Sequence, residues 1–364
     1  MYIVIFCSIL ALLLTELESN GLLKGAMKWG FFIVTLLGCI HYNYGNDYKA
    51  YHNVYNTIVS IPFDWGLLIS GHIYKEPGWA ILCYIFEDIG GFFMMVAVLN
   101  IVQNVIIYKA IKNNVNRRWW TLSIFIYLFS TSFYLLNFSM MRQGLVVCLF
   151  LGVWEAIKHK RFLISLIILL LCYTIHNSAI ILLPVLLACF VKIKNGRIAT
   201  LMFILTYILL WFKGGFINEI LSLFLFVDDI ADYAVSYGEE FNSNTYGIGF
   251  ILNLIPFILS LIYIADRSRV QEHSDKLAVA ISIMCFIIAP FTEVIPLIGR
   301  VGMYFGVYQI IAIPKIYSNV ATPILRIPLL TIFCIMLIYN YMKFFNSPVF
   351  HDSYSTFHTI FSAI

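Results

Sequence analysis

The chain has 364 residues, of which 61% are hydrophobic and only 12% are charged, and its formal net charge is +4. This composition excludes a soluble protein, because soluble domains contain about 25% charged residues. The small net charge gives no reason to expect binding to nucleic acid. Apolar runs recur from residue 1 to about residue 341, which excludes a single anchor on a soluble domain and predicts one membrane domain over residues 1–364.

The apolar segments predict an all-α, polytopic integral membrane protein with about 12 transmembrane helices, because unpaired backbone is too costly in lipid. They lie near residues 1–15, 29–41, 90–108, 119–138, 143–157, 162–175, 178–191, 198–212, 247–265, 277–290, 300–314 and 327–342. Several are shorter than the ~20 residues of a full span, so we expect tilted or interrupted helices. The first segment has no basic residue before it and no small-residue cleavage site after it, so we expect a retained helix.

The basic residues predict the orientation of the chain in the membrane. If the loops alternate, seventeen of the 23 lysines and arginines fall on one side and six on the other. This bias assigns the larger set to the cytoplasm, and it places both termini and two longer loops, near 42–78 and 213–246, on the periplasmic side. Most acidic residues of that side lie in the two loops, so we expect the chemistry to face outward.

Residues 162–191 provide a test of this orientation. Basic clusters stand at both ends of the segment, at 158–161 and 192–194. Thirty residues give about 45 Å of α-helix, which is too long for one span and short for two. We therefore expect the chain to turn back at the polar tip formed by His176, Asn177 and Ser178.

Four ionisable residues share a predicted depth near the outer edge of the hydrocarbon. Arg142, His176, Glu293 and Arg300 lie 15 to 17 residues from a basic border, or roughly 22–26 Å along a helix. Charged groups at such a depth usually face the bundle interior or a water-filled cavity, which makes each a candidate functional residue. The alternatives are arginines that snorkel to the interface and a histidine that only caps a turn.

The types of these residues indicate a chemistry. Two arginines suit a diphosphate, and in a group transfer they could stabilise a pyrophosphate leaving group as its charge develops. His176, Glu76 or Glu293 could remove a proton from an attacking sugar hydroxyl, and the sequence does not choose among them.

The first outer loop supplies a second group of candidates. Tyr48, Tyr51 and Tyr55 share one helical face and could present rings and hydroxyls to sugars, or else form an interfacial aromatic belt. A belt does not explain Asp47 and Glu76, which are candidate catalytic carboxylates. We expect no metal and no cofactor, because the eight cysteines are scattered singly and the acidic loops lack an EF-hand pattern.

Short motifs along the chain resemble those of a known family. They are Asn46-Asp47-Tyr48 with Tyr51, Glu76-Pro77-Gly78, Met141-Arg142-Gln143-Gly144, Lys160-Arg161-Phe162, Thr174-Ile175-His176-Asn177-Ser178-Ala179, and Arg300-Val301-Gly302-Met303-Tyr304-Phe305. Together they resemble the EpsG-like family of polysaccharide-synthesis proteins, which overlaps with Wzy-type O-antigen polymerases. The resemblance covers nearly the whole chain, and the Arg-Gln and His-Asn-Ser motifs carry most of its specificity.

The resemblance implies a membrane glycosyltransferase with a lipid-diphosphate donor, working without metal at the periplasmic face of a bacterial inner membrane. Its substrates would be undecaprenyl-diphosphate-linked oligosaccharide and the growing polysaccharide, and a chain-length regulator is a possible protein partner. Arg142 and Arg300 would hold the diphosphate, and His176 would lie beside the reacting groups. Asp47, Tyr48 and Glu76 would line the acceptor side. The other motif residues expected to bind substrate are Gln143, Asn177, Tyr51 and Tyr304.

Two other functions are alternatives to this polymerase hypothesis. A lipid-linked oligosaccharide flippase would need polar groups distributed through the midplane, whereas the clearest ionisable residues here cluster at the outer edge. A membrane acyltransferase that modifies the glycan would more naturally contain a His-Asp dyad or a second embedded histidine. The cluster at the outer edge favours a one-sided enzyme over a translocation path, and neither feature of an acyltransferase is clear in the sequence.

Overall fold

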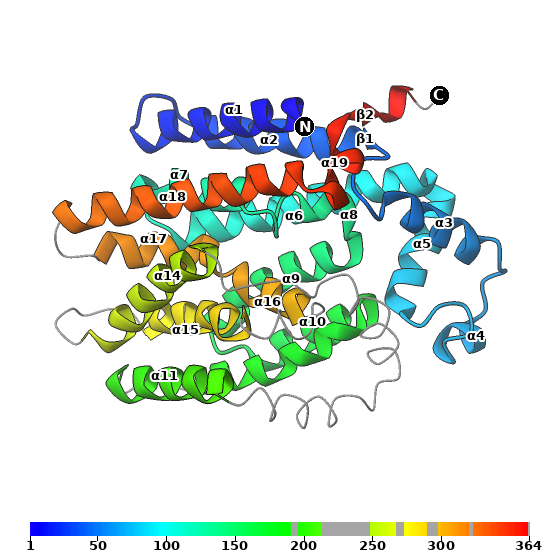
Figure 1. The fold of residues 1–364 in the computed structure, drawn as a ribbon. Coiled ribbons are helices and arrows are strands. Elements are labelled where there is room, and N and C mark those ends of the chain that lie inside the picture. The colour runs from blue at the N-terminus through cyan, green and yellow to red at the C-terminus, as the bar shows by residue number, and fades with distance from the viewer. Residues whose placement is uncertain (191–195, 213–247, 267–272, 290–297, 320–322, 363–364) are drawn as a thin grey trace. The chain divides into compact units, whose positions relative to one another are not determined.

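The computed structural model describes residues 1–190, 196–212, 248–266, 273–289, 298–319 and 323–362. Helices dominate the described chain (Figure 1). The helices of the N-terminal half are α1 (Tyr2–Ser19), α2 (Ala26–Ile40), α3 (Tyr48–Val59), α4 (Trp65–Ile69), α5 (Pro77–Ile89), α6 (Gly91–Asn114), η1 (Arg117–Trp119), α7 (Trp120–Phe129), α8 (Leu136–Ser139), α9 (Met141–Lys158), α10 (Phe162–Ile175) and η2 (Asn177–Cys189). The later helices are α11 (Gly196–Phe212), α14 (Ile248–Ala265), α15 (His273–Ile288), α16 (Ile298–Gly306), α17 (Gln309–Asn319), α18 (Pro323–Asn346), α19 (Pro348–Ser355) and η4 (Ile360–Ser362).

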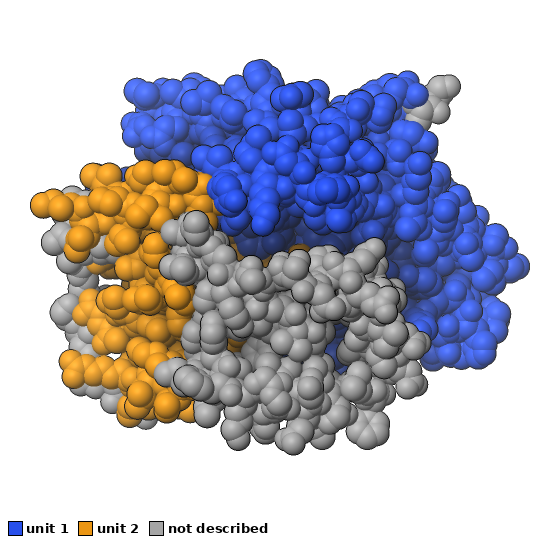
Figure 2. Space-filling view, in the orientation of Figure 1, with its two compact units in different colours: residues 1–190, 337–364 blue, residues 191–336 orange. Residues whose placement is uncertain are grey.

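Two compact units emerge from the contacts within the chain (Figure 2). Unit 1 comprises residues 1–190 and 337–364, and unit 2 comprises residues 191–336. In unit 1 the two ends of the chain meet: the amino group of Met1 donates to the carbonyl of Ser355 at 3.0 Å. The short strands β1 (His41–Tyr42) and β2 (His358–Thr359) also pair there, antiparallel.

Helices cover the described parts of the predicted apolar segments, whereas α3, α4, α5 and α19 lie outside them, and the protein is an all-α membrane protein. By length and composition, α1, α6 and residues 324–346 of α18 could each cross a membrane. Shorter apolar helices include α2, α10, η2 and parts of α11 and α14. The number of about 12 spans stays a prediction.

Two segments predicted as single helices are interrupted. Segment 119–138 breaks after α7, where Ser130 is extended, and α8 resumes only at Leu136. Segment 300–314 breaks between Gly306 of α16 and Gln309 of α17. Serine and threonine side chains at 130–132 compete with the helix for backbone hydrogen bonds, and glycine has low helix propensity, so both breaks have a local cause.

The segment expected as an outer loop, 42–78, contains helices α3 and α4. Its tyrosines form the helical face that the spacing predicted, but this face is directed inward: Tyr48, Tyr51 and Tyr55 are all buried. Tyr48 packs edge-on against His41 and Phe92. This face is therefore core rather than an interfacial belt. The other segment, 213–246, lies outside the described residues.

Residues 162–190 break at the predicted position. Helix α10 ends at Ile175, His176 is extended, and the 3-10 helix η2 begins at Asn177 and packs against α10. A 3-10 helix rises about 2 Å per residue, so thirteen residues cover roughly 26 Å. The tighter winding explains how so short a segment can cover almost the ~30 Å thickness of a hydrocarbon core.

Polar side chains lie inside the helix bundle of unit 1. The Tyr127 hydroxyl donates to Asn104 at 3.0 Å, and the Asn137 amide donates to the Tyr127 hydroxyl at 3.3 Å. Gly144 of α9 lies directly against this network, because a Cβ there would be 2.9 Å from Asn137 Oδ1 and 3.3 Å from Gln103 Nε2. Such internal hydrogen bonds fix the packing of helices that have only lipid as solvent.

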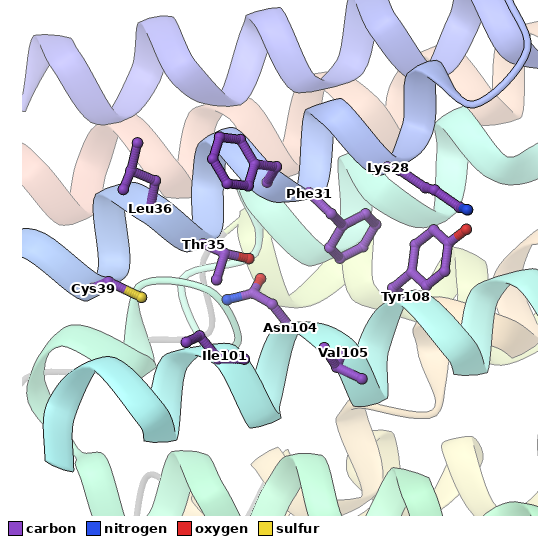
Figure 3. A pocket seen from close by; sticks show the side chains of 10 residues that line it. Lys28, Phe31, Thr35, Leu36, Cys39, Ile101, Asn104, Val105 and Tyr108 are labelled. Carbon is purple, nitrogen blue, oxygen red and sulfur yellow. The ribbon is translucent and has the colours of Figure 1, made fainter. Parts of the chain in front are cut away.

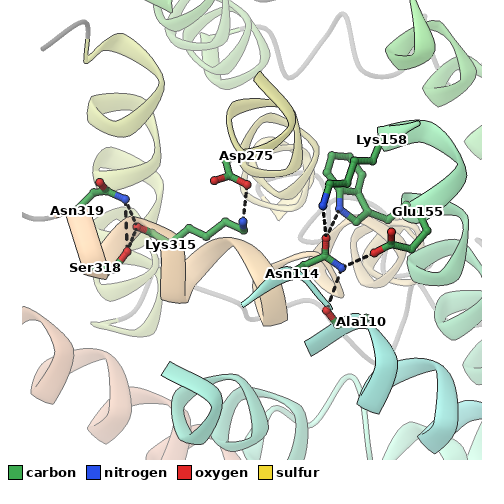
Figure 4. A network of polar contacts seen from close by, with 9 residues as sticks. Ala110, Asn114, Glu155, Lys158, Asp275, Lys315, Ser318 and Asn319 are labelled. Carbon is green, nitrogen blue, oxygen red and sulfur yellow. Dashed lines mark hydrogen bonds and ion pairs between the residues drawn. The ribbon is translucent and has the colours of Figure 1, made fainter. Parts of the chain in front are cut away.

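Charged residues at helix ends have partners within each unit (Figure 4). In unit 1, Asn114 at the end of α6 accepts from Trp154 and Lys158, and it donates to Glu155 at 2.7 Å. In unit 2, Lys315 of α17 pairs with Asp275 of α15. The lysines in both groups belong to the set that the sequence assigns to the cytoplasm.

Candidate functional site

The site of unit 1 begins at the start of α5. Glu76 is the residue before the helix, and Pro77 occupies its first position, where a missing N–H costs nothing. Gly78 lies so close to Thr174 at the end of α10 that a Cβ would clash with the threonine side chain and backbone. This close approach brings the loop ahead of α5 beside His176.

The Glu76 carboxylate receives three donors from distant parts of the sequence. His176 Nδ1 lies 2.7 Å from Oε1, and the backbone N–H of Asn177 donates to the same oxygen at 3.0 Å. The other oxygen, Oε2, pairs with Nη1 of Arg142. The side chain of Glu76 is only 6% exposed, whereas those of His176 and Arg142 are 18% and 23% exposed. The buried carboxylate therefore organises two more accessible groups.

Two tyrosines flank the Arg142 guanidinium. The Nη1 group donates to the Tyr74 hydroxyl at 2.6 Å, and Nε donates to the Tyr51 hydroxyl at 3.4 Å. The guanidinium carbon also lies 5.4 Å from the centre of each tyrosine ring, within the range of cation–π attraction. Trp79 packs edge-on against the ring of Tyr51 and restricts its position. An arginine at the first turn of an apolar helix is thus held in one orientation.

The electrostatics of the loop groups follow from this arrangement. Burial alone would raise the pKa of Glu76, but the His176 hydrogen bond, the Arg142 charge and the Asn177 N–H together hold that pKa below its ordinary value. Burial raises the pKa of Tyr74 to about 12, although the neighbouring Arg142 opposes the shift. The cluster therefore contains an ionised carboxylate and neutral phenols near neutral pH.

The geometry leaves one basic atom of the cluster available for chemistry. When the Nδ1–H group of His176 donates a hydrogen bond to Glu76, Nε2 carries the lone pair of the neutral ring and can accept a proton. A carboxylate that fixes the tautomer and ring orientation of a histidine is a recurrent arrangement for general base catalysis. Glu76 itself is buried and already accepts from three donors, so it is less suited to be the base.

The remaining predicted residues of unit 1 differ in how far they are buried. Asp47 is half-buried at the start of α3, and its backbone N–H donates to Ser139 at 3.2 Å. Gln143 is 1% exposed and lies in the bundle, and Tyr48 is 1% exposed. These two residues are parts of the core rather than of an exposed sugar-binding surface. Asn177 is exposed, and it contributes to the cluster through its backbone.

The other predicted residues belong to unit 2 or to undescribed positions. Arg300 and Tyr304 both lie on α16, where Arg300 is half-buried and Tyr304 is fully buried. Glu293 lies outside the described residues.

Tyr74 is a member of the cluster that the sequence analysis did not identify. Its position two residues before Glu76 is the signal that could have found it, since a chain segment that delivers a carboxylate can deliver its neighbour too. Gly78 and Thr174 belong to the motifs of the sequence, but nothing in the sequence indicates that they are in contact.

Two further features of the described residues bear on ligand binding. Within them, no group of three histidine, cysteine or acidic side chains could hold a metal ion. A groove of about 440 Å³ lies between α2 and α6, with an almost wholly apolar lining and the Lys28 amine and Tyr108 hydroxyl at one end (Figure 3). None of the predicted site residues lines this groove.

Comparison with known proteins identifies the family of the chain. Neither the curated proteins nor the solved structures yielded a match to this chain. The model of the EpsG family matches residues 29–358, which include α3, the loop that carries Glu76, and the helix ends that carry Arg142 and His176. The match extends over nearly the whole sequence, and the chain belongs to the EpsG family.

Proposed function

We propose that this protein polymerises undecaprenyl-diphosphate-linked oligosaccharide repeat units into O-antigen or a related surface polysaccharide. The reaction is a glycosyl transfer at the periplasmic face of a bacterial inner membrane. The observation that carries the proposal is the cluster of Arg142, Glu76 and His176, which combines an anion-binding group with an oriented base. Membership of the EpsG family supports the same class of reaction.

His176 is the general base in this proposal. Its Nε2 takes the proton from a hydroxyl of the acceptor sugar, while Glu76 holds the ring through Nδ1. The sugar oxygen then forms a bond to the anomeric carbon of the donor glycan. The bond between that carbon and the diphosphate oxygen breaks, and its electron pair leaves with the lipid diphosphate.

Arg142 stabilises the departing diphosphate in this proposal. A guanidinium offers several N–H donors in a planar fork that matches phosphate oxygens, and its charge is permanent. Negative charge develops on the leaving oxygen in the transition state, so a fixed cation near it accelerates the reaction. The assignment of Arg300 to diphosphate binding stays a prediction from the sequence.

The proposal is tested by substitution in the native bacterium. Arg142→Ala and His176→Ala should each leave the protein level in the membrane unchanged and reduce the long surface polysaccharide to single-repeat material on a gel. Matched controls are Arg118→Ala and His72→Ala, which remove exposed side chains outside the cluster and should preserve chain length.

The outcomes separate the competing functions. Normal chain lengths in both variants would contradict the assignment of these residues. Loss of all surface glycan in a deletion strain would indicate a flippase instead. Full-length glycan that lacks an acyl group would indicate an acyltransferase.

A further inference from the structure

The carboxylate of Glu76 is shared between two residues that the proposed reaction uses for opposite purposes. Its Oε2 neutralises Arg142, which the reaction needs as a free cation. Its Oε1 is bound separately, by His176 Nδ1 at 2.7 Å and the Asn177 N–H at 3.0 Å. The two halves of one carboxylate therefore have independent partners.

While Arg142 is paired with Glu76, its capacity to bind another anion is limited. The Nη1 group is already engaged by Tyr74 and Glu76, and Nε faces Tyr51. An incoming diphosphate competes with Glu76 for the same positive charge. Because Arg142 is the more exposed partner, the anion can approach it while Glu76 stays buried.

We propose that Glu76 is a stand-in for the donor's diphosphate on Arg142, and that the donor displaces it from the arginine alone. This inference rests on the proposed function. After displacement, Oε1 keeps its bonds to His176 and Asn177, so the base remains oriented while the cation turns to the substrate. Glu76 is thus a positioning residue, because it acts through Arg142 and His176 and does not touch the reacting atoms.

Glu76→Gln separates the two roles. An amide oxygen can still accept from His176 and Asn177, but the amide NH₂ cannot accept from Arg142, so the guanidinium is released. Donor affinity should increase roughly tenfold, which corresponds to about 1.4 kcal/mol. Turnover should fall roughly 10- to 100-fold, because a neutral amide orients and stabilises the imidazolium less well than a carboxylate.

The experiment uses the purified full-length protein. The dissociation constant of undecaprenyl diphosphate is measured by native mass spectrometry, and kcat and KM are measured with lipid-linked repeat units extracted from the native bacterium. Glu87→Gln, an exposed carboxylate on α5, is the matched control and should change neither constant. Tighter binding combined with slower turnover supports the stand-in.

Weaker or unchanged binding in Glu76→Gln would overturn the inference, since it would mean that Glu76 only builds the Arg142 site. Glu76→Asp gives a second test in case the amide variant does not fold. The shorter carboxylate cannot bridge both partners, so binding tighter than wild type is expected and weaker binding contradicts the idea. If the wild type binds the lipid but forms no polymer, the proposed function fails while the binding comparison still decides the role of Glu76.

Discussion

A single buried carboxylate determines the arrangement of the candidate site. The side chain of Glu76 is 6% exposed, and an unpaired charge so far from water would cost several kcal/mol. Its three donors offset that cost, and they come from two segments that are remote in sequence, at Arg142 and at His176–Asn177. The ionised state of Glu76 and the geometry of the cluster therefore depend on each other.

This dependence predicts how stability changes with pH. The folded protein holds the pKa of Glu76 below its ordinary value, so the unfolded chain binds more protons in that range. The contribution of Glu76 to stability should be complete above its ordinary value near 4.5, and it should be lost as the pH falls through the lower folded value. Thermal unfolding of the purified protein between pH 7 and pH 3 measures the effect.

The control for this titration is Glu76→Gln, which has no carboxyl proton to bind. The variant should unfold at a lower temperature than wild type at pH 7, and the difference should narrow below about pH 4.5. An equal separation of the two curves at every pH would show that Glu76 is not held ionised by its partners.

At the scale of elements, the site depends on how closely α5 approaches the end of α10. The Thr174 backbone carbon would lie 2.9 Å from a Cβ at position 78, so only glycine fits there without movement. The long side chains of the cluster can reach one another only because α5 and the end of α10 lie this close together.

Gly78→Ala should therefore separate the two elements and move Glu76 away from His176. A misplacement of about 1 Å can cost on the order of 100-fold in rate, and overpacking costs about 1–3 kcal/mol of stability. Polymer length in the native bacterium and the thermal unfolding temperature of the purified variant measure the two effects.

Gly152→Ala is the matched control, because a Cβ there would meet only Ile106 at 3.4 Å and alanine favours the interior of helix α9. It should retain long polymer and at least the stability of the wild type. Long polymer in Gly78→Ala would show that the close approach of α5 and α10 is not needed for the site.

At the scale of the whole molecule, the sequence predicts elements better than it predicts contacts. Hydropathy and charge are local properties, so they located most of the helices and the break at His176, although they did not predict α5. They missed the breaks near Ser130 and Gly306, where short polar or glycine positions interrupt otherwise apolar runs. Periodicity predicted the shared face of Tyr48, Tyr51 and Tyr55, but it could not indicate that this face is buried in the core.

The contacts of the site show the same limit. Counting residues from the basic borders gave Arg142 and His176 a similar depth, yet many side chains share any one depth in a bundle. Glu76 lies 66 residues from Arg142 and 100 residues from His176, and nothing local joins them. Only the packing of particular side chains, such as Gly78 against Thr174, determines which residues at that depth touch.

The orientation of the whole chain is the prediction that links the cluster to the outer face. The positive-inside bias assigns Asn177 to the periplasmic side and Arg118 to the cytoplasm, and both residues are exposed. In a background where the eight native cysteines are replaced by alanine, Asn177→Cys should react in intact spheroplasts with a thiol reagent that cannot cross the membrane. Arg118→Cys should react only after the membrane is broken. The reverse pattern would place the Glu76 cluster at the cytoplasmic face, where a polymerase of exported, lipid-linked units could not use it.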